Sequence, residues 1–349
     1  MGAKLEAKPL HSVNFDVKLK LSATCTVIKN EGRADEQIIC EKKHNVLRNG
    51  GRDHVHNLMF VNAATSAAGH RSINHIGLST DAGRPSRSTA VGTTTGLITD
   101  SGLEAAEATT RTDNGYTGAT CVQTLSKVFT ATAAKAGIQK TYLMSRVPAT
   151  GAFTSWIVVH EVQMPVVNMG VGDTLTMTWV ITVTRQLAGT IVMLNAVGNY
   201  TGGLGEIIGR IYRELQSEQV HGSAQFGINN IGLSTNNAAP DPTVVAIPNI
   251  LVAAGMGRDN GTVAHTAGTA ITTITHTFTA TGVQANIRKA SLHSSSTSGH
   301  SSPYFYGNFD SPKSLQIGDS ISVTWTMTVQ ARWPLSGSVR PANSNETSR

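Results

Sequence analysis

The sequence predicts an all-β protein built from two tandem antiparallel β-sandwich units, jelly-roll-like, each with one short helix. Three observations predict this fold. An octet occurs twice with almost the same letters, and apolar residues alternate with small polar ones in several segments. Charged residues make up only 14% of the chain and aromatic residues 5%, whereas Thr, Ser, Gly and Ala are abundant. This composition favours short strands and turns over long charged helices.

The repeat extends well beyond the octet. INHIGLST at 73–80 matches INNIGLST at 228–235 in seven of eight positions, at a spacing of 155 residues. Further matches follow in the same order at spacings of 149 and then 146 residues: Phe129 with Phe278, Ile138 with Ile287, and Trp179 with Trp325. A spacing that drifts by a few residues is typical of loop-length changes in a duplicated domain.

The duplication and the length of 349 residues indicate two domains with flanking arms. We expect residues 1–45 to form an N-terminal arm and a strand or hairpin that joins the first unit. Residues 46–188 form the first β-sandwich unit and residues 189–333 the second. Residues 334–349 show no strand pattern and are expected to form an extended C-terminal arm.

The first element is a strand in VNFDVKLKLSATCTV, whose alternate residues from Val13 to Leu21 are apolar. A hairpin that turns at Gly32-Arg33 would place Cys25 opposite Cys40. This geometry permits a disulfide but does not require one, and buried thiols in a reducing compartment are the alternative.

A short helix is predicted next in each unit, in GGRDHVHNLMF from Gly50 and GLGEIIGRIYR from Gly203. Asp53 and Glu206 fall in the expected first turn, where an acid favours a helix. The apolar residues that share one helix face are Val55, Leu58 and Met59 in the first unit and Ile208, Ile211 and Tyr212 in the second.

The last strand of each unit shows the clearest alternation. The residues predicted to face the core are Leu175, Met177, Trp179, Ile181 and Val183, and in the second unit Ile321, Val323, Trp325, Met327 and Val329. Asp173 and Asp319 precede these strands, and we interpret each Gly-Asp pair as a turn rather than a metal site. DNG at 113–115 and at 259–261 predicts two hairpin turns.

At this point the motifs resemble a known class. NGGRD, then INxIGLS, then FTATG with IRKASL, then GDxxxxTWTMTV are similar to a module of structural proteins of tailed-phage virions, in minor head, decoration or tail components. The resemblance covers most of both units and is greatest over residues 228–332. The second unit has GLGE in place of GRD, so the resemblance assigns no required role to Arg52 or Asp53.

No catalytic, cofactor or metal site is predicted. GxSxG and HExxH patterns are absent from the sequence. HSSSTSGHSS at 293–302 is a low-complexity loop, which gives no rigid placement to a nucleophile. His54 and His56 stand two residues apart on a helix and point to different faces, so we expect them not to converge on one metal ion with His70 or His75.

The leading hypothesis is therefore a non-enzymatic structural protein of a phage virion, binding neighbouring capsid or tail subunits as a decoration, cement or shell component. The alternative is a tail fibre or spike protein that binds a host receptor or glycan through exposed aromatic residues. The candidate aromatic residues are Tyr200, Tyr304, Phe305 and Tyr306, although a strand that buries PYFY side chains is the preferred interpretation. A polysaccharide depolymerase would require a parallel β-helix, and no short strand repeat is visible.

The expected partners are other copies of this chain and other virion proteins. The net charge of +6 is scattered without a basic stripe, so we expect no nucleic-acid partner, and no apolar run reaches membrane length. MGAKLEAKPLHS has no apolar core, so we expect synthesis in the host cytoplasm, without a signal peptide, and incorporation into the virion. The residues expected at the subunit interface are Leu5, Leu10, Trp333 and Leu335.

Overall fold

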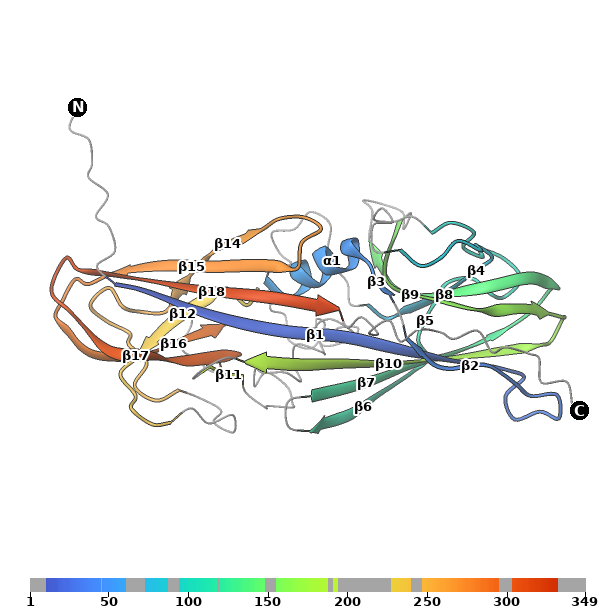
Figure 1. Ribbon diagram of the computed structural model, residues 1–349, viewed down its shortest axis with the longest axis horizontal. Coiled ribbons are helices and arrows are strands. Elements are labelled where there is room, and N and C mark those ends of the chain that lie inside the picture. Colours follow the sequence, from blue (N-terminus) through green and yellow to red (C-terminus); the bar gives the residue numbers. More distant parts are fainter. Residues whose placement is uncertain are drawn as a thin grey trace, which may run out of the picture.

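The computed structural model confirms the all-β prediction. It describes residues 11–44, 46–60, 73–86, 94–117, 120–147, 155–187, 191–193, 227–239, 247–294 and 303–331. These residues form three β-sheets and one helix, α1 (Asn49–Phe60). The molecule is elongated, and β1 (His11–Lys29) runs along much of its length (Figure 1).

The largest sheet, called the large sheet below, contains eight strands. Its order is β14 (Thr262–His265), β15 (Ile271–Thr279), β18 (Ser320–Ala331), β1, β10 (Thr174–Leu187), β7 (Thr120–Thr130) and β6 (Thr110–Thr117), with β2 (Gln37–His44) paired to β1. Its inner face is apolar. Its outer face consists largely of Thr and Ser, because side chains alternate along each strand.

Two smaller sheets of five strands each complete the fold. The first small sheet has the order β3 (Val46–Leu47), β9 (Ser155–Met169), β8 (Lys135–Val147), β4 (His75–Ser79) and β5 (Ala106–Glu107). The second small sheet has the order β11 (Ile191–Met193), β17 (Phe305–Leu315), β16 (Gln284–His293), β12 (Asn230–Ser234) and β13 (Asp259–Asn260).

The strand order is the same in both parts of the chain. Each octet strand, β4 or β12, pairs with the fourth strand after it in the chain, β8 or β16, and this strand pairs in turn with β9 or β17. An isolated bridge also recurs, between Ser79 and Leu97 and between Ser234 and Ile250. The sequence repeat therefore corresponds to a repeat of strand connections.

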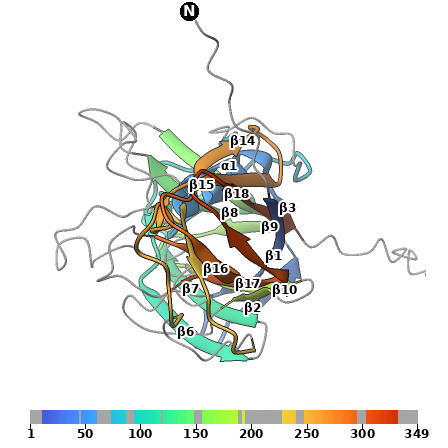
Figure 2. The ribbon, with the colours of Figure 1, turned by 90° about the vertical axis from the view of Figure 1, so that its left-hand side faces the viewer.

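β1 joins the two sets of strands into one sheet. Its first half pairs in parallel with β18, from His11↔Ile321 onward, and its second half pairs antiparallel with β10, ending at Lys29↔Leu175. Seen from one end of the molecule, the second set of strands lies in front of the first (Figure 2). The division into units at residues 188 and 189 remains an interpretation of the repeat, because in the fold the two sets share the large sheet.

Both small sheets cover the same face of the large sheet. Trp179 on β10 lies 6.3 Å from His160 on β9, between ring centroids, and Trp325 on β18 lies 6.3 Å from Phe305 on β17. Phe15 on β1 stacks on Trp325 at 4.4 Å. Every residue predicted to face the core in β10 and β18 is buried, which confirms the alternation inferred from the sequence.

The helix differs from its prediction in one respect. Val55, Leu58 and Met59 are buried as expected. Asp53, however, is the fifth residue of α1 and does not lie in the first turn, so the role inferred from helix electrostatics was wrong. Glu206 and the second predicted helix lie outside the described residues.

Two turn predictions are also corrected. Asp113 begins an irregularity in the pairing of β6 with β7, and residues 259–261 lead from β13 in one sheet to β14 in another, so neither DNG is a hairpin turn. At Gly261 an added Cβ would lie 2.7 Å from Ile274, which explains why a glycine suits this crossing.

The β1–β2 hairpin does turn around Gly32, as expected, but its register was predicted incorrectly. Cys25 pairs with Lys43, and Cys40 pairs with Val27, so the two cysteines are offset rather than opposite. The pairing is already one residue out of the predicted register at Lys29↔Gln37, and two irregularities increase the offset. All three cysteines are free thiols.

Candidate functional site

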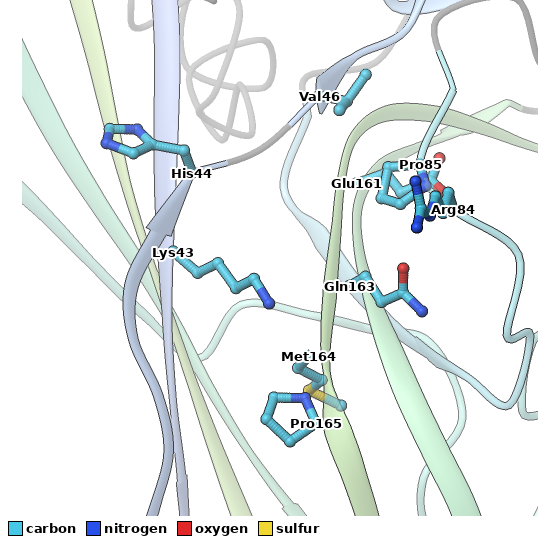
Figure 3. A pocket seen from close by; sticks show the side chains of 9 residues that line it. All are labelled: Lys43, His44, Val46, Arg84, Pro85, Glu161, Gln163, Met164 and Pro165. Atoms are coloured by element: carbon cyan, nitrogen blue, oxygen red, sulfur yellow. The ribbon is translucent and has the colours of Figure 1, made fainter. Parts of the chain in front are cut away.

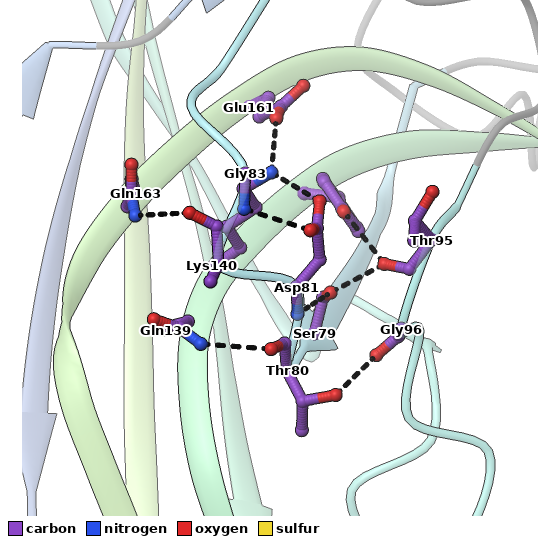
Figure 4. A network of polar contacts seen from close by, with 12 residues as sticks. Ser79, Thr80, Asp81, Gly83, Thr95, Gly96, Gln139, Lys140, Glu161 and Gln163 are labelled. Carbon is purple, nitrogen blue, oxygen red and sulfur yellow. Dashed lines mark hydrogen bonds and ion pairs between the residues drawn. The ribbon is translucent and has the colours of Figure 1, made fainter.

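The first small sheet contains a buried network of charged side chains, shown in part in Figure 4. Lys140 on β8 donates hydrogen bonds to Asp81 at 2.6 Å and to Glu161 on β9 at 3.1 Å. The other oxygen of Glu161 accepts from Arg48, which follows β3, at 2.5 Å. Two cations thus face two carboxylates, and the side chains of Lys140 and Glu161 are only 2% and 1% exposed.

Hydrogen bonds hold the loop that carries Asp81. The backbone N–H of Asp81 donates to Ser79 Oγ at 3.0 Å, and the Ser79 hydroxyl donates to the carbonyl of Thr95 at 2.7 Å. Gln139 donates to the carbonyl of Thr80 at 2.9 Å, and Gln163 donates to that of Ala82 at 3.2 Å. The loop is therefore fixed to both β8 and β9.

The network stabilises charge and is poorly suited to proton transfer. Burial opposes protonation of Lys140, but hydrogen bonds to Asp81 and Glu161 outweigh it and raise the pKa of this amine above its ordinary value. The hydrogen bond from Lys140, followed by one from the Gly83 N–H, lowers the pKa of Asp81. Lys140 therefore stays protonated and Asp81 ionised near neutral pH, so neither group is prepared to act as a base or an acid.

The second small sheet repeats the lysine without the carboxylates. Lys289 takes the place of Lys140, and Asn236 takes the place of Asp81 in the same turn, where its N–H donates to Ser234 Oγ at 3.0 Å. Lys289 donates to the carbonyl of Ala238 at 2.6 Å and lies 5.3 Å from the centre of the Tyr306 ring. Burial lowers the pKa of Lys289, the reverse of the direction at Lys140.

Next to the charged network lies a groove between β2 and β9, which we call the β2–β9 groove (Figure 3). It has a volume of ≈ 570 Å³ and is lined by Lys43, His44, Val46, Arg84, Pro85, Glu161, Gln163, Met164 and Pro165. Lys43 extends from β2 across the groove toward β9, with Arg84 and Gln163 on the opposite side (Figure 3). The size lies within the usual range of ligand sites.

A second polar cluster joins α1 to the loop between β14 and β15. Asp53 accepts from the N–H of Gly268 at 2.7 Å and lies 2.9 Å from His265 Nε2. His56 stacks on His265 with 4.0 Å between ring centroids and contacts Thr272 at 2.8 Å. The cluster therefore links the helix of the first unit to a hairpin of the second, which explains the position of Asp53.

Four histidines were considered as metal ligands from the sequence, and the structure describes three of them. His54 and His56 are both buried on α1, His75 contacts Asn74 at 2.6 Å, and His70 lies outside the described residues. Within the described part of the chain, no three His, Cys, Asp or Glu side chains gather in a way that could hold a metal ion. Asp173 accepts from Lys29, Gly170 and Asn30, and so holds a turn, as the sequence suggested.

The predicted interface residues Leu5, Leu10, Trp333 and Leu335 all lie outside the described residues, as does the candidate aromatic residue Tyr200. Tyr304, Phe305 and Tyr306 are described and buried, in agreement with the preferred interpretation of PYFY. Residues 295–302, most of the serine-rich loop, also lie outside the described part.

The sequence interpretation did not identify the charged network. One signal was available: Lys140 and Lys289 occupy equivalent positions in the repeat, in the matching segments IQK and IRK. The partners of Lys140 are 59 and 21 residues away in the chain, and no local pattern indicated them.

Comparison with family models, curated proteins and solved structures gives no match for this chain. No helix among the described residues is long and apolar enough to cross a membrane.

Proposed function

We propose that this chain is a non-enzymatic structural protein of a phage virion that binds neighbouring capsid or tail subunits. The motif resemblance supports this proposal, since NGGRD, INxIGLS, FTATG and GDxxxxTWTMTV occur in one chain in the order typical of such modules. The proposed partners are other copies of the chain and other virion proteins, and the proposed location is the assembled particle.

The observation that carries the proposal is the way β1 connects the two sets of strands. A single strand pairs with β18 on one side and with β10 on the other, so the two repeated parts form one continuous sheet. Such an arrangement transmits force through backbone hydrogen bonds and resists bending between the parts, properties that suit a component of a particle. The ion pairs of the charged network hold the first small sheet together, and their positive and negative charges neutralise one another.

The burial of the PYFY side chains bears on the alternative of a glycan-binding fibre or spike. Tyr304, Phe305 and Tyr306 are at most 2% exposed, so they are not available to stack on a sugar. Tyr200 lies outside the described residues. No observation in the described part of the chain favours this alternative.

Immunogold electron microscopy tests the proposal. Phage particles are induced from the strain that encodes the chain, purified on a density gradient and labelled with antibody raised against the recombinant protein. We expect gold at regular positions on the head or tail. Particles that carry no label, while the antibody still detects the free protein in the same lysate, would contradict a place in the virion.

A truncation tests the assembly part of the proposal. Removal of residues 1–10 and 336–349, which includes Leu5 and Leu10, two of the four predicted interface residues, should leave a folded chain that no longer assembles with its copies or attaches to particles. Light scattering after size-exclusion chromatography measures assembly, and circular dichroism checks the fold. Normal assembly of the truncated chain would disprove the role of the arms.

A further inference from the structure

We propose that the β2–β9 groove binds an extended, acidic peptide segment of a partner protein. The inference does not depend on the chain being a virion component, because the groove and its charges belong to the isolated chain.

Charge gives the first argument. Lys43 and Arg84 line the groove and are exposed, and neither forms an ion pair with a carboxylate in the described part of the chain. Glu161 is the acidic residue among those that line it, but this side chain is buried and already held by Arg48 and Lys140. The groove therefore presents uncompensated positive charge, which favours an acidic ligand.

An open strand edge gives the second argument. β3 pairs with β9 only at Val46↔Glu161 and Leu47↔His160, whereas β8 pairs along the other edge of β9 as far as Met169. Beyond Glu161, no described strand pairs with the edge of β9 that faces the groove. Backbone groups at such an edge can hydrogen-bond to an added extended segment. Pro165 lacks an N–H, so the added pairing should be short.

The lining of the groove gives the third argument. Val46, Pro85, Met164 and Pro165 supply apolar contacts between the charged side chains. Successive side chains of an extended peptide point to opposite sides, so acidic residues can face Lys43 and Arg84 while small apolar residues face the apolar lining. A mixed lining of this kind fits a peptide better than a bare phosphate ion.

The second set of strands does not repeat the groove. β2 pairs with β1 beside the first unit, and the described residues contain no equivalent strand beside β17. The polar residues beneath the groove also differ. In the second set of strands Asn236 stands in place of Asp81, and Lys289 contacts the carbonyl of Ala238 and the ring of Tyr306 instead of carboxylates. We therefore expect one peptide to bind per chain.

Fluorescence anisotropy with the purified full-length chain tests the proposal. The probe is a fluorescein-labelled, end-capped decapeptide in which Glu alternates with Val or Thr, measured at low ionic strength. We expect saturable 1:1 binding that weakens with added salt. The double substitution Lys43→Glu and Arg84→Glu should weaken binding by about tenfold or more.

Lys42→Glu is the control. It makes the same charge change as one of the two replacements, on the same strand as Lys43, at an exposed side chain outside the groove lining. It should change the affinity by less than about twofold. Melting curves verify that all variants fold. Absence of saturable binding, equal loss in the control, or equal binding of a peptide with Lys in place of Glu would each overturn the proposal.

Hydrogen exchange and competition separate peptide docking from simple anion binding. The bound peptide should slow amide exchange in residues 161–167 of β9. Displacement of the probe by inorganic phosphate or by an oligouronate at similar concentration, with no change in exchange, would show a general anion site and overturn the peptide proposal.

Discussion

The two equivalent lysines show how the same residue is stabilised differently in two copies of one strand arrangement. Lys140 is almost fully buried between Asp81 and Glu161, whereas Lys289 contacts a carbonyl and an aromatic ring. Burying a charge is unfavourable unless opposite charges and hydrogen bonds compensate. The first unit compensates its lysine with carboxylates, and the second with a carbonyl dipole and a ring face.

This difference predicts unequal effects of the same substitution. Lys140→Met leaves Glu161 with one cation fewer in a buried site, so we expect a loss of about 3 kcal/mol or more in the free energy of unfolding. Lys289→Met removes a buried amine but leaves no described carboxylate without its ion-pair partner. We therefore expect the free energy of unfolding to change by about 1 kcal/mol or less. Urea denaturation of both variants measures the difference, and equal losses would contradict the assigned role of the carboxylates.

The surroundings of Asp173 predict that the stability of the fold decreases in acid. The hydrogen bond from Lys29, with those from Gly170 and Asn30, lowers the pKa of the Asp173 carboxyl in the folded chain from an ordinary 3.8 to about 2. Stability from this carboxylate is therefore complete above about pH 4 and is lost as the pH falls toward about 2.

Asp173→Asn should lower the free energy of unfolding by about 1 kcal/mol near pH 7, a value reduced for partial exposure to solvent. The difference from the unsubstituted chain should shrink as the pH approaches about 2. Denaturation curves across this interval are the measurement. A difference that does not vary with pH would show that the charge of Asp173 contributes nothing.

At the scale of elements, one glycine-containing turn recurs in both sets of strands. Gly102 and Gly255 both adopt positive φ, at 72° and 74°. Each lies against the carbonyl of the last residue of a long strand, and an added Cβ would be 2.3 Å from Thr130 O and 2.1 Å from Thr279 O. Conformation and close approach both favour glycine at these two positions.

We therefore predict that Gly102→Ala and Gly255→Ala each lower the free energy of unfolding by about 3 kcal/mol. Gly318→Ala is the control, because its φ is 90° but no atom lies within 4 Å of an added Cβ. This control should lose only about 1 kcal/mol, from backbone strain alone. A loss in the control as large as in the other variants would exclude the close contact as the cause.

At the scale of the whole molecule, one core spans both sets of strands. Buried residues from β1, β10 and β18 belong to a single hydrophobic cluster with residues of both small sheets. Phe15, on the shared strand, packs directly on Trp325 and lies 6.1 Å from Phe309 between ring centroids. The two parts should therefore unfold together.

Trp179→Ala and Trp325→Ala test this cooperativity. Both side chains are completely buried, so each truncation should cost about 3 to 5 kcal/mol. Each should shift one common melting transition, observed by calorimetry. Two separate transitions, of which a given substitution moves only one, would show that the units are independent despite the shared sheet.

The sequence by itself determined the all-β class, the helix at Val55–Met59 and the burial of Trp179 and Trp325. These features depend on local periodicity, since alternation along a strand decides which side chains face the core. The repeat also indicated equivalent strands correctly, because matching letters in the same order imply matching positions.

Only the tertiary structure decided which strands share a sheet and which charges meet. His11 pairs with Ile321 across most of the chain, and Asp81, which follows β4, meets Lys140 on the neighbouring strand β8. The register of the β1–β2 hairpin offsets Cys25 from Cys40. Asp53 likewise has its partners in a distant hairpin. Such contacts depend on strand register and on how loops close. A local pattern of apolar and polar residues specifies which face of a strand is buried, but it does not specify which partner covers that face.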